Sequence, residues 1–445
     1  MREGGSVMRR VIRRGISTGT ICMLATVVVV LAGFGYLFTV FTGNSDITLD
    51  AQRLVVAIDD SVNRITEEAK AMAQTGKADT APDQDHTFVQ KGQVTATPVP
   101  TATPIPKKTF TLCAAGGFKS NAKLVKAHTN GDTIRMDVIT DQAKGAMEAD
   151  LSLLTLENLV TGAKTSDTNQ PAELLSAIAA LGVDYLNIGF PGALDLGMDG
   201  LNATQEAITA AGMTPIGVGN GSLTIIQNGI RVAILHFQSE LNKAANKKTT
   251  ADERSAVLSG MEMEDMTSAI RQARENGAEI VLVTLCWGKA GATSPTDTQK
   301  EVAQSLADAG ADIILGTRSS IVQPVTILTA QRGDGRYHPV LCAYSLGNLF
   351  TTNRDKRNYL AGIILNAQVM YDPLTGCVAF DDLTYTPTYC WRGKEEKMTL
   401  QRVLLCDGRE TPAFVAKDQL TSMNDCKEQI GKAMADSPFT LKETK

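Results

Sequence analysis

The chain has 445 residues, which is enough for one large domain with accessory segments. Hydrophobic residues make up 43% of it and charged residues 20%, which is ordinary for a globular protein. Its net charge is −5 and the body of the chain has no basic stripe, which argues against a general nucleic-acid-binding protein.

The first elements expected are a basic cytoplasmic tail over residues 1–15 and a membrane anchor over residues 16–42. The tail contains five arginines, and an uncharged apolar run covers residues 21–41. About 20 apolar residues span the hydrocarbon core of a membrane, whereas a cleavable signal has about 7–15. We therefore expect a single-pass anchor, with a cleaved signal as the alternative. Arginines before the anchor place the N-terminus in the cytoplasm and the main domain outside the cell.

Residues 46–75 predict an amphipathic or coiled-coil helix. Apolar side chains recur there at alternating spacings of four and three, at Ala51, Val55, Ile58, Val62, Ile65, Ala69 and Met72. This pattern is typical of a parallel coiled coil, which would join two chains through residues 51–72. A single amphipathic helix lying on the membrane or the domain is the alternative. Residues 76–108 are polar and then rich in proline and threonine, which favours an extended, semi-rigid linker.

Residues 109–410 predict one α/β domain. Four times a helical pattern ends in a glycine and a short apolar strand follows directly, at Gly182, Gly212, Gly277 and Gly310. Further strands are expected at residues 110–116, 149–156, 230–237 and 340–346, and antiparallel strands between residues 361 and 405. Short apolar runs without alternation suit strands of a helix-covered parallel sheet. Residues 411–445 predict a closing helix and a tail.

Ligands of such sheets bind beyond the carboxyl ends of the strands. The stretch from Glu279 to Phe350 predicts a strand, a helix and two further strands, and the expected position of the site follows from it. We therefore expect the functional site near Cys286–Ala290, Thr317–Ser320 and Ser345–Asn348.

Seven short stretches, in this order and spacing, carry a resemblance to a known family. They are Ala149–Glu157, Leu194–Leu201, Gly217–Asn220, Cys286–Gly288, Ala309–Asp312, Gln323–Pro324 and Tyr344–Asn348. Together they resemble the CapA family, named for poly-γ-glutamate capsule synthesis, over residues 110 to 350. The resemblance implies a metallophosphoesterase-like layered α/β sandwich and a role in the biosynthesis or export of a capsule or cell-surface polymer.

The sequence departs from the family where metal ligands would lie. The aspartate that ends the family's first strand is Gly117 here, and the family's Ala-Asn-Asn-His is Gly189–Gly192. Its His-Trp-Gly-x-Glu is Cys286–Ala290, and its Gly-His-His-x-His is Gly316–Ser320. The chain has four histidines, and no histidine is expected to pair with another or with a nearby carboxylate at ligand spacing. We therefore expect no metal pair and no other cofactor.

In place of metal charge, the chain offers Lys119, Lys289 and Arg318 near the ends of neighbouring strands. A guanidinium grips carboxylate or phosphate with two hydrogen bonds, and lysines add point charge. We expect the cleft to bind an anionic surface polymer, with Glu157 and Asp195 holding the cations by ion pairing. The alternative is that the three cations are solvated rim residues. The other candidate ligand-binding residues are Asn220, Trp287, Ser345 and Asn348, and Ser345 and Asn348 also suit a turn that closes the cleft.

The catalytic candidates are Cys286, at a strand end, and His236, late in a strand. A small buried hydrophobic residue is the alternative for Cys286, and a packed or hydrogen-bonded histidine for His236. The chain has eight cysteines, and one or two disulfides are open in the last part, among Cys377, Cys390, Cys406 and Cys426.

Two functions remain open from the sequence. The first is a membrane-anchored, extracellular CapA-like protein that acts as a non-catalytic binding or scaffolding subunit, with other capsule-synthesis subunits as partners and no nucleic acid. The second is a hydrolase or transferase of the metallophosphoesterase-like superfamily with a rebuilt active site.

Overall fold

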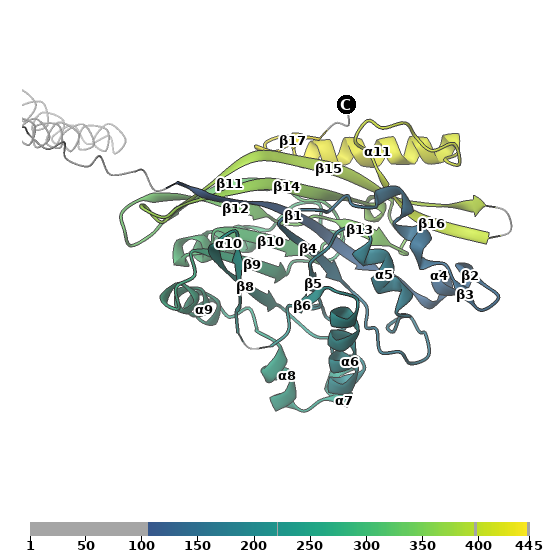
Figure 1. Ribbon diagram of the computed structural model, residues 1–445, viewed down its shortest axis with the longest axis horizontal. Helices are drawn as coiled ribbons and strands as arrows, with labels where there is room; N and C mark the ends of the chain where they lie inside the picture. Colours follow the sequence, from purple (N-terminus) through teal and green to yellow (C-terminus); the bar gives the residue numbers. More distant parts are fainter. Residues whose placement is uncertain (1–105, 220, 396–397, 443–445) are drawn as a thin grey trace, which may run out of the picture. The chain divides into compact units, whose positions relative to one another are not determined.

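The computed structural model describes residues 106–219, 221–395 and 398–442 (Figure 1). The expected basic tail, anchor, coiled-coil helix and nearly all of the linker lie outside this range, and so does Asn220. Within the described residues, no helix has the length and apolar character needed to cross a membrane.

Two β-sheets form the centre of the domain. The larger contains β1 (Lys108–Lys119), β4 (Leu151–Leu156), β5 (Tyr185–Asn187), β6 (Thr214–Ile216), β13 (Asn348–Thr351), β14 (Ala361–Asp372), β15 (Cys377–Glu395), β16 (Met398–Leu405) and β17 (Thr440–Leu441). The smaller contains β7 (Leu223–Gln227), β8 (Ile230–Gln238), β9 (Ile280–Cys286), β10 (Ile313–Thr317), β11 (Val325–Gln331) and β12 (Tyr337–Ala343). A two-stranded ribbon of β2 (Thr129–Asn130) and β3 (Thr133–Ile134) lies apart from both.

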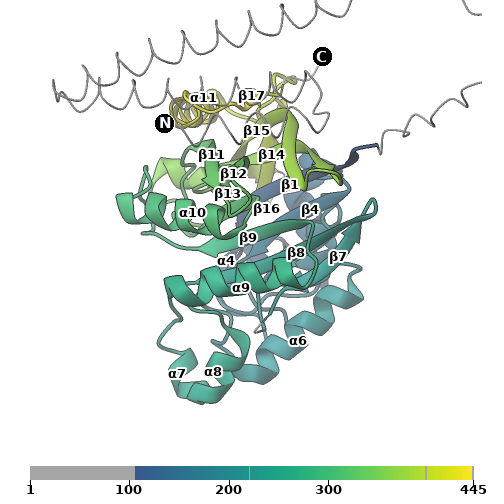
Figure 2. The same ribbon diagram turned by 90° about the vertical axis from the view of Figure 1, so that its left-hand side faces the viewer.

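The helices connect these strands and cover the sheets. They are α4 (Ala122–Ala127), α5 (Glu173–Ala179), α6 (Gly197–Ala210), α7 (Ala245–Lys248), α8 (Ala251–Val257), α9 (Met263–Glu275), α10 (Asp297–Ala309) and α11 (Lys417–Ala433). Three short 3₁₀ helices are η1 (Met136–Ile139), η2 (Asp141–Ala143) and η3 (Arg357–Leu360). Figure 2 shows α9 and α10 along the outer side of the smaller sheet, and α11 packs against β14 and β15 of the larger one.

Each sheet combines parallel and antiparallel pairing. The larger runs in the order β16-β15-β14-β1-β4-β5-β6, with β13 also paired to β1 and β17 to β15. The smaller runs β11-β12-β10-β9-β8-β7. Strands β1, β4, β5 and β6 are parallel in one sheet, and β8, β9, β10 and β12 are parallel in the other. The prediction of one parallel sheet was therefore incomplete, because the parallel strands divide between two sheets and antiparallel strands extend both.

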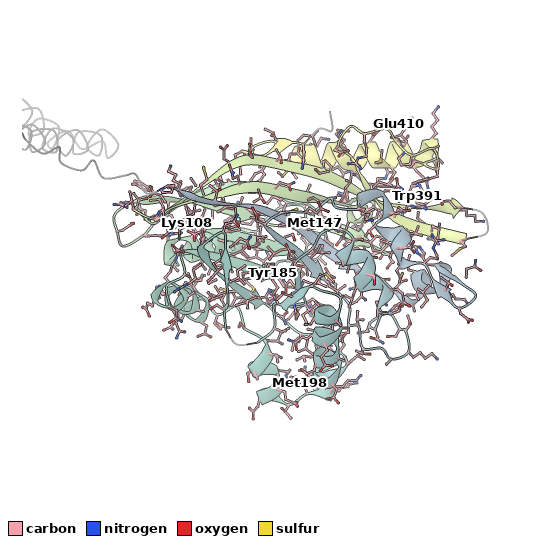
Figure 3. All side chains as sticks on the ribbon, viewed as in Figure 1. Lys108, Met147, Tyr185, Met198, Trp391 and Glu410 are labelled. Carbon is pink, nitrogen blue, oxygen red and sulfur yellow. The ribbon has the colours of Figure 1, made fainter. Side chains whose placement is uncertain are left out.

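Alternation along β9 shows how the layers pack. Ile280 and Leu282 belong to the core shared with the larger sheet, whereas Val281 and Val283 belong to the core shared with α9 and α10. Successive side chains of a strand point to opposite faces, so a strand covered on both sides is apolar throughout. Side chains pack throughout the domain (Figure 3), and the fully buried Met147 belongs to the same core as Ile280. The structure confirms the α/β class and the layered sandwich.

The four predicted helix-to-strand joins are confirmed. Gly182, Gly212, Gly277 and Gly310 have φ angles of 87°, 84°, 88° and 124°, in the left-handed region that ends a helix at low steric cost. Helix α10, which Gly310 ends, begins with a capping box in which the Thr296 side chain accepts a hydrogen bond from the backbone of Gln299 at 3.2 Å. The predicted antiparallel strands are β14, β15 and β16, and the predicted closing helix is α11.

The cysteines of the described domain are free. Cys377, Cys390, Cys406 and Cys426, where the sequence left one or two disulfides open, carry unpaired thiols in the structure. Burial raises the pKa of the Cys390 thiol to about 12, so it stays protonated and acts as a small apolar side chain.

Candidate functional site

A cleft of about 620 Å³ lies where parallel strands of both sheets end. Its walls come from the ends of β1, β9 and β10, from β13, and from the segments that follow β4, β5 and β8. The charged groups that line it are Lys119, Glu157, Asp167, Asp195, Glu240 and Arg318. The sequence expected a site near Cys286–Ala290, Thr317–Ser320 and Ser345–Asn348, and all three stretches contribute lining residues.

Each cation that lines the cleft is held by a carboxylate. Lys119 Nζ lies 3.6 Å from Glu157 Oε2, which is the ion pair expected for Glu157. Arg318 forms an ion pair with Glu240 and donates a further hydrogen bond from Nη1 to Ser239 Oγ at 2.9 Å. Because four carboxylates and two cations line the cleft, an anionic ligand competes with a carboxylate at whichever cation it binds.

Asp195 does not hold a cation, so the expectation for this residue was wrong. Its Oδ2 accepts a hydrogen bond from Asn242 Nδ2 at 2.8 Å. Asn242 lies in the loop after β8, 47 residues further along the chain, and both residues line the cleft. An amide thus occupies the place where the sequence analysis put a lysine or an arginine.

Trp287, Ser345 and Lys289 do not line the cleft. Trp287 is 2% exposed, stacks on Tyr344 with ring centroids 5.9 Å apart and donates from Nε1 to the Tyr344 carbonyl at 3.0 Å. Ser345 is fully buried and its Oγ accepts a hydrogen bond from Ser319 Oγ at 2.8 Å. Lys289 is exposed beside the cleft. Trp287 and Ser345 therefore support the site from within the core, and neither side chain lines the cleft.

Asn348 lines the cleft in a fixed orientation. Its Nδ2 donates to the carbonyl of Tyr359 at 2.9 Å and to that of Ser320 at 3.2 Å. These bonds turn Oδ1 toward Gly117, because a Cβ added to Gly117 would lie 3.1 Å from that oxygen. Asn348 is therefore both a turn residue and a hydrogen-bond acceptor at the wall of the cleft.

The residues present do not fit the metal pair that the family resemblance implies. A Cβ at Gly117, where the family has aspartate, would lie 2.6 Å from Glu157 Oε1, so a carboxylate already occupies that space. The other substituted positions present Gly192, Thr317 and Arg318, and no histidine is among the residues that line the cleft. Within the described part of the chain, no group of three or more His, Cys, Asp or Glu side chains converges as a metal site would.

The loop after β10 holds two side chains in an unusual backbone conformation. Arg318 has a φ of 85° and Ser320 a φ of 59°, in the left-handed region that residues with a Cβ rarely adopt. Each such residue raises the free energy of the folded state by about 1–2 kcal/mol. Backbone strain of this kind concentrates at functional sites. Here it directs Arg318 into the cleft, at the segment where the family carries its histidines.

Cys286 lines the cleft but is not an activated nucleophile. Its side chain is 3% exposed, and burial, reinforced by the negative charge of Glu157, raises the pKa of its thiol to about 12. A cysteine reacts as its thiolate, and a thiol with this pKa is almost entirely protonated at neutral pH. The thiol therefore contributes to the wall of the cleft as a neutral group.

His236 lies outside the cleft, between the two sheets. Its Nδ1 is 2.9 Å from Thr284 Oγ1 and 3.4 Å from Asn187 Nδ2. Burial lowers the pKa of His236 to about 4, which keeps the imidazole neutral at physiological pH. These contacts fit the alternative reading of His236 as a packed, hydrogen-bonded histidine. The expectation that no histidine pairs with a nearby carboxylate was wrong for His338, because its Nε2 pairs with Asp334 Oδ2 at 2.9 Å.

Sequence reasoning missed several lining residues. Glu240 and Asn242 follow β8 directly, so the rule that sites lie beyond strand ends predicts them once it is applied to residues 230–237. Tyr359 and Thr351 also line the cleft, and they come from η3 and β13. No local signal marks those two, since tertiary folding alone brings them to the site.

Comparison with known proteins finds one family and two relatives that share its role in capsule synthesis by name. The model of a family described as bacterial capsule synthesis protein PGA_cap matches residues 111–353. The PGA biosynthesis protein CapA of Bacillus subtilis (strain 168) is 26% identical over 258 residues, which cover 51% of this chain and 64% of the relative. The capsule biosynthesis protein CapA of Bacillus anthracis is 25% identical over 215 residues, 47% of this chain and 50% of the relative. The chain thus spans less than two thirds of each relative.

Solved structures with some similarity include two phosphatase-type proteins. A phosphatase from Mycoplasma pneumoniae shares 11% identity at a TM-score of 0.37, over 71% of this chain and 100% of the other. The calcineurin-like phosphoesterase YfkN from Bacillus subtilis shares 12% identity at a TM-score of 0.37, over 74% and 99%.

Proposed function

Because the chain belongs to the PGA_cap family of bacterial capsule synthesis proteins, we propose that it binds an anionic surface polymer of the poly-γ-glutamate type during its synthesis or export. In this proposal the chain is a membrane-anchored subunit whose domain lies outside the cell and binds without hydrolysing. Residues 1–42 support the anchor through their arginines and apolar run. The printed names of the two Bacillus relatives, which refer to PGA and capsule biosynthesis, support the polymer class.

The proposal that the cleft binds without metal chemistry rests on the cations found at the strand ends. At the strand ends where the family has metal ligands, this chain presents an arginine and a lysine, each in contact with one carboxylate. These are the groups that bind carboxylates reversibly, since ion pairs form and exchange without breaking covalent bonds. Cys286, the nucleophile candidate in the cleft, is held as a neutral thiol.

Arg318 is the centre of the proposed site. Its side chain is 23% exposed and is supported by Ser239, whereas the Glu240 side chain is 58% exposed. Glu240 can therefore turn into solvent and leave the guanidinium to a carboxylate of the polymer, which an arginine binds with two parallel hydrogen bonds. Lys119, which is 52% exposed, provides a second point of attachment beside Glu157. Salt screens the ion pairs with the two cations and should weaken the binding, and repulsion from the remaining carboxylates favours a ligand that engages both cations.

The test is a titration of purified full-length chain with polyglutamate at low ionic strength. Arg318→Ala removes a charge-assisted hydrogen-bond donor and should weaken binding about tenfold. Glu240→Gln removes the competing carboxylate and should tighten binding. Lys289→Ala is the matched control, because Lys289 is an exposed cation that does not line the cleft. The proposal fails if Arg318→Ala binds as the unmodified chain does, or if Lys289→Ala weakens binding equally.

A further inference from the structure

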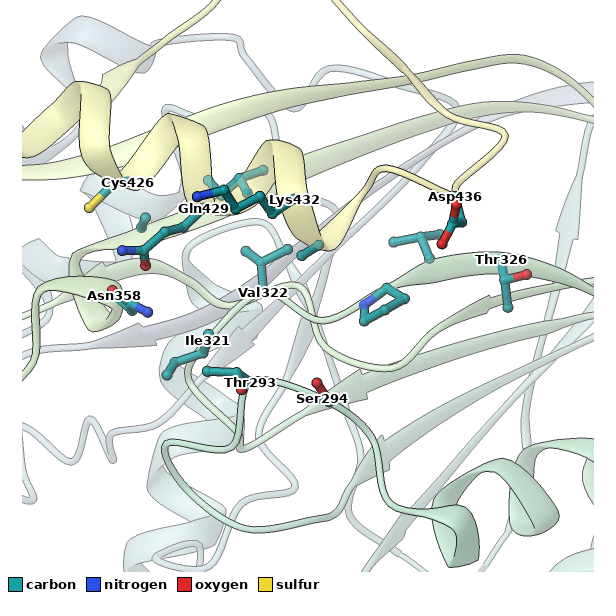
Figure 4. Close-up of a pocket in the computed structure, with 15 residues that line it drawn as sticks. Thr293, Ser294, Ile321, Val322, Thr326, Asn358, Cys426, Gln429, Lys432 and Asp436 are labelled. Atoms are coloured by element: carbon teal, nitrogen blue, oxygen red, sulfur yellow. The ribbon is translucent and has the colours of Figure 1, made fainter.

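A second cavity, the α11 groove, lies between α11 and the segment that leads into β11 (Figure 4). Its volume is about 470 Å³, within the range typical of small-molecule sites. Buried side chains form its floor, namely Ile321, Val322, Val325, Ala361, Cys426 and Ile430, each between 1% and 7% exposed. The floor is aliphatic apart from one thiol, whose pKa is raised to about 11 by burial and which is therefore neutral.

The rim of the α11 groove is polar and includes two charged side chains, Lys432 and the carboxylate of Asp436. Thr293, Ser294, Asn358 and Gln429 contribute hydroxyl and amide groups. Lys432 Nζ lies 2.7 Å from Glu428 Oε1, so its charge is already balanced. Among the described residues that line the groove, none is aromatic. A base or a sugar ring would therefore find no aromatic ring to stack on.

The α11 groove adjoins the cleft along a thin wall. In the loop after β10, Ser320 lines the cleft and the next residue, Ile321, lines the groove. In η3, Tyr359 lines the cleft and Asn358 the groove. The wall includes the two left-handed residues of the β10–β11 loop, so the same loop shapes both cavities.

We propose that the α11 groove binds the aliphatic chain of a membrane amphiphile. Transfer of such a chain from water onto the buried aliphatic floor is favourable, and the rim, with its hydroxyl, amide and charged groups, suits a polar head group. The groove follows α11 from Cys426 to Ala433, which is about 10 Å at the rise of an α-helix. The membrane is the expected source of the occupant, because the anchor expected at residues 16–42 would join the domain to a bilayer through the linker. This inference rests on the membrane anchoring of the proposed function but not on polymer binding in the cleft.

The test uses full-length chain reconstituted with phosphatidylcholine vesicles that contain a small fraction of phospholipid with a photoreactive diazirine in one acyl chain. After illumination, mass spectrometry of a digest locates the lipid adducts. We expect adducts on the peptides that contain Ile321–Thr326 and Cys426–Ala433. Ala433→Trp places an indole in the groove and should reduce these adducts at least tenfold. Thr421→Trp, at an exposed position of α11 that does not line the groove, should leave them unchanged.

Three outcomes would overturn the proposal. The first is an absence of adducts on both groove peptides while residues 21–41 are labelled, since lipid then reaches the chain and avoids the groove. The second is an equal loss of adducts in Ala433→Trp and Thr421→Trp. The third is labelling spread evenly over the exposed surface of the domain. An extended peptide from another protein as the true occupant would give the first outcome.

Discussion

The burial of His236 predicts a specific pH dependence of stability. The imidazole is 8% exposed, lies between the two sheets, and has its pKa lowered from 6.5 to about 4 by burial. An unfolded chain protonates this histidine below about pH 6.5, whereas the folded chain does so only below about pH 4. Between these values the unfolded state binds more protons, so stability falls as the pH falls. The contribution is fully present above the unfolded pKa.

The magnitude follows from the two pKa values. Linkage with a folded pKa of about 4 and an unfolded pKa of 6.5 gives a loss of about 2 kcal/mol between pH 7.5 and pH 5. In His236→Asn this loss should disappear, because the amide does not titrate and can keep the contact with Thr284. The variant should also be less stable at pH 7.5, because an asparagine fills less of the space between the sheets.

The assay is urea unfolding at pH 7.5 and pH 5, followed by tryptophan fluorescence. Both tryptophans of the chain, Trp287 and Trp391, lie in the folded domain and are at most 2% exposed, so their emission reports its unfolding. Burial also lowers the pKa of His128, which remains in the variant, so the difference between the two proteins isolates His236. An equal loss of stability in the two proteins between these pH values would show that His236 does not cause the pH dependence.

The remaining predictions concern reactivity and the core. Cys286, with a thiol pKa raised to about 12, should react with iodoacetamide at pH 8 at least about 1,000-fold more slowly than an exposed cysteine, and at the ordinary rate in urea; rapid labelling of the folded chain would contradict its burial. Asp312→Ala should destabilise the domain by about 3–5 kcal/mol in urea unfolding, because it leaves Arg274 and Arg332 without their fully buried carboxylate; a loss below 1 kcal/mol would show that water replaces it. Gly310→Ala should lower stability by about 1–2 kcal/mol, since its φ of 124° disfavours a Cβ, and an unchanged midpoint would refute this.

The helices and strands of the domain were largely predictable, because their signals are local. The glycines that end α5, α6, α9 and α10 stand immediately before short apolar strands, and the structure places every one in the left-handed region. The division into two sheets was not predictable in this way. Strand β1 pairs with β14, more than 200 residues later, and pairings at such separations leave no mark in a local window.

The candidate site was predictable in position and less so in composition. The strand-end rule located Cys286, Thr317, Arg318 and Asn348 at one cleft. Because side chains alternate along a strand, Cys286 and Trp287 are expected to point in opposite directions, but the sequence does not tell which of them faces the cleft. The partner of Arg318, Glu240, is 78 residues away, and only the folded loops show that it takes the place expected for Asp195.

The family resemblance was correct, and its departures from the pattern were informative. Residues 111–353 match the family, and Gly117 faces the carboxylate of Glu157 in the space where the family has an aspartate. The substitutions at the strand ends therefore belong together, because each puts a small, neutral or cationic residue where a metal ligand would otherwise lie. The expectations for the anchor and the dimerising helix stay predictions, since residues 1–105 lie outside the described structure.

The stoichiometry of bound metal shows whether the cleft holds a metal centre. Purified full-length chain would be equilibrated with Mn²⁺, Fe²⁺ or Zn²⁺, freed of excess by gel filtration and analysed by inductively coupled plasma mass spectrometry. We expect well under one equivalent of any of these metals per chain, unchanged in Glu157→Ala. One or two equivalents that are lost in Glu157→Ala would contradict it, because they would show a metal centre at the cleft.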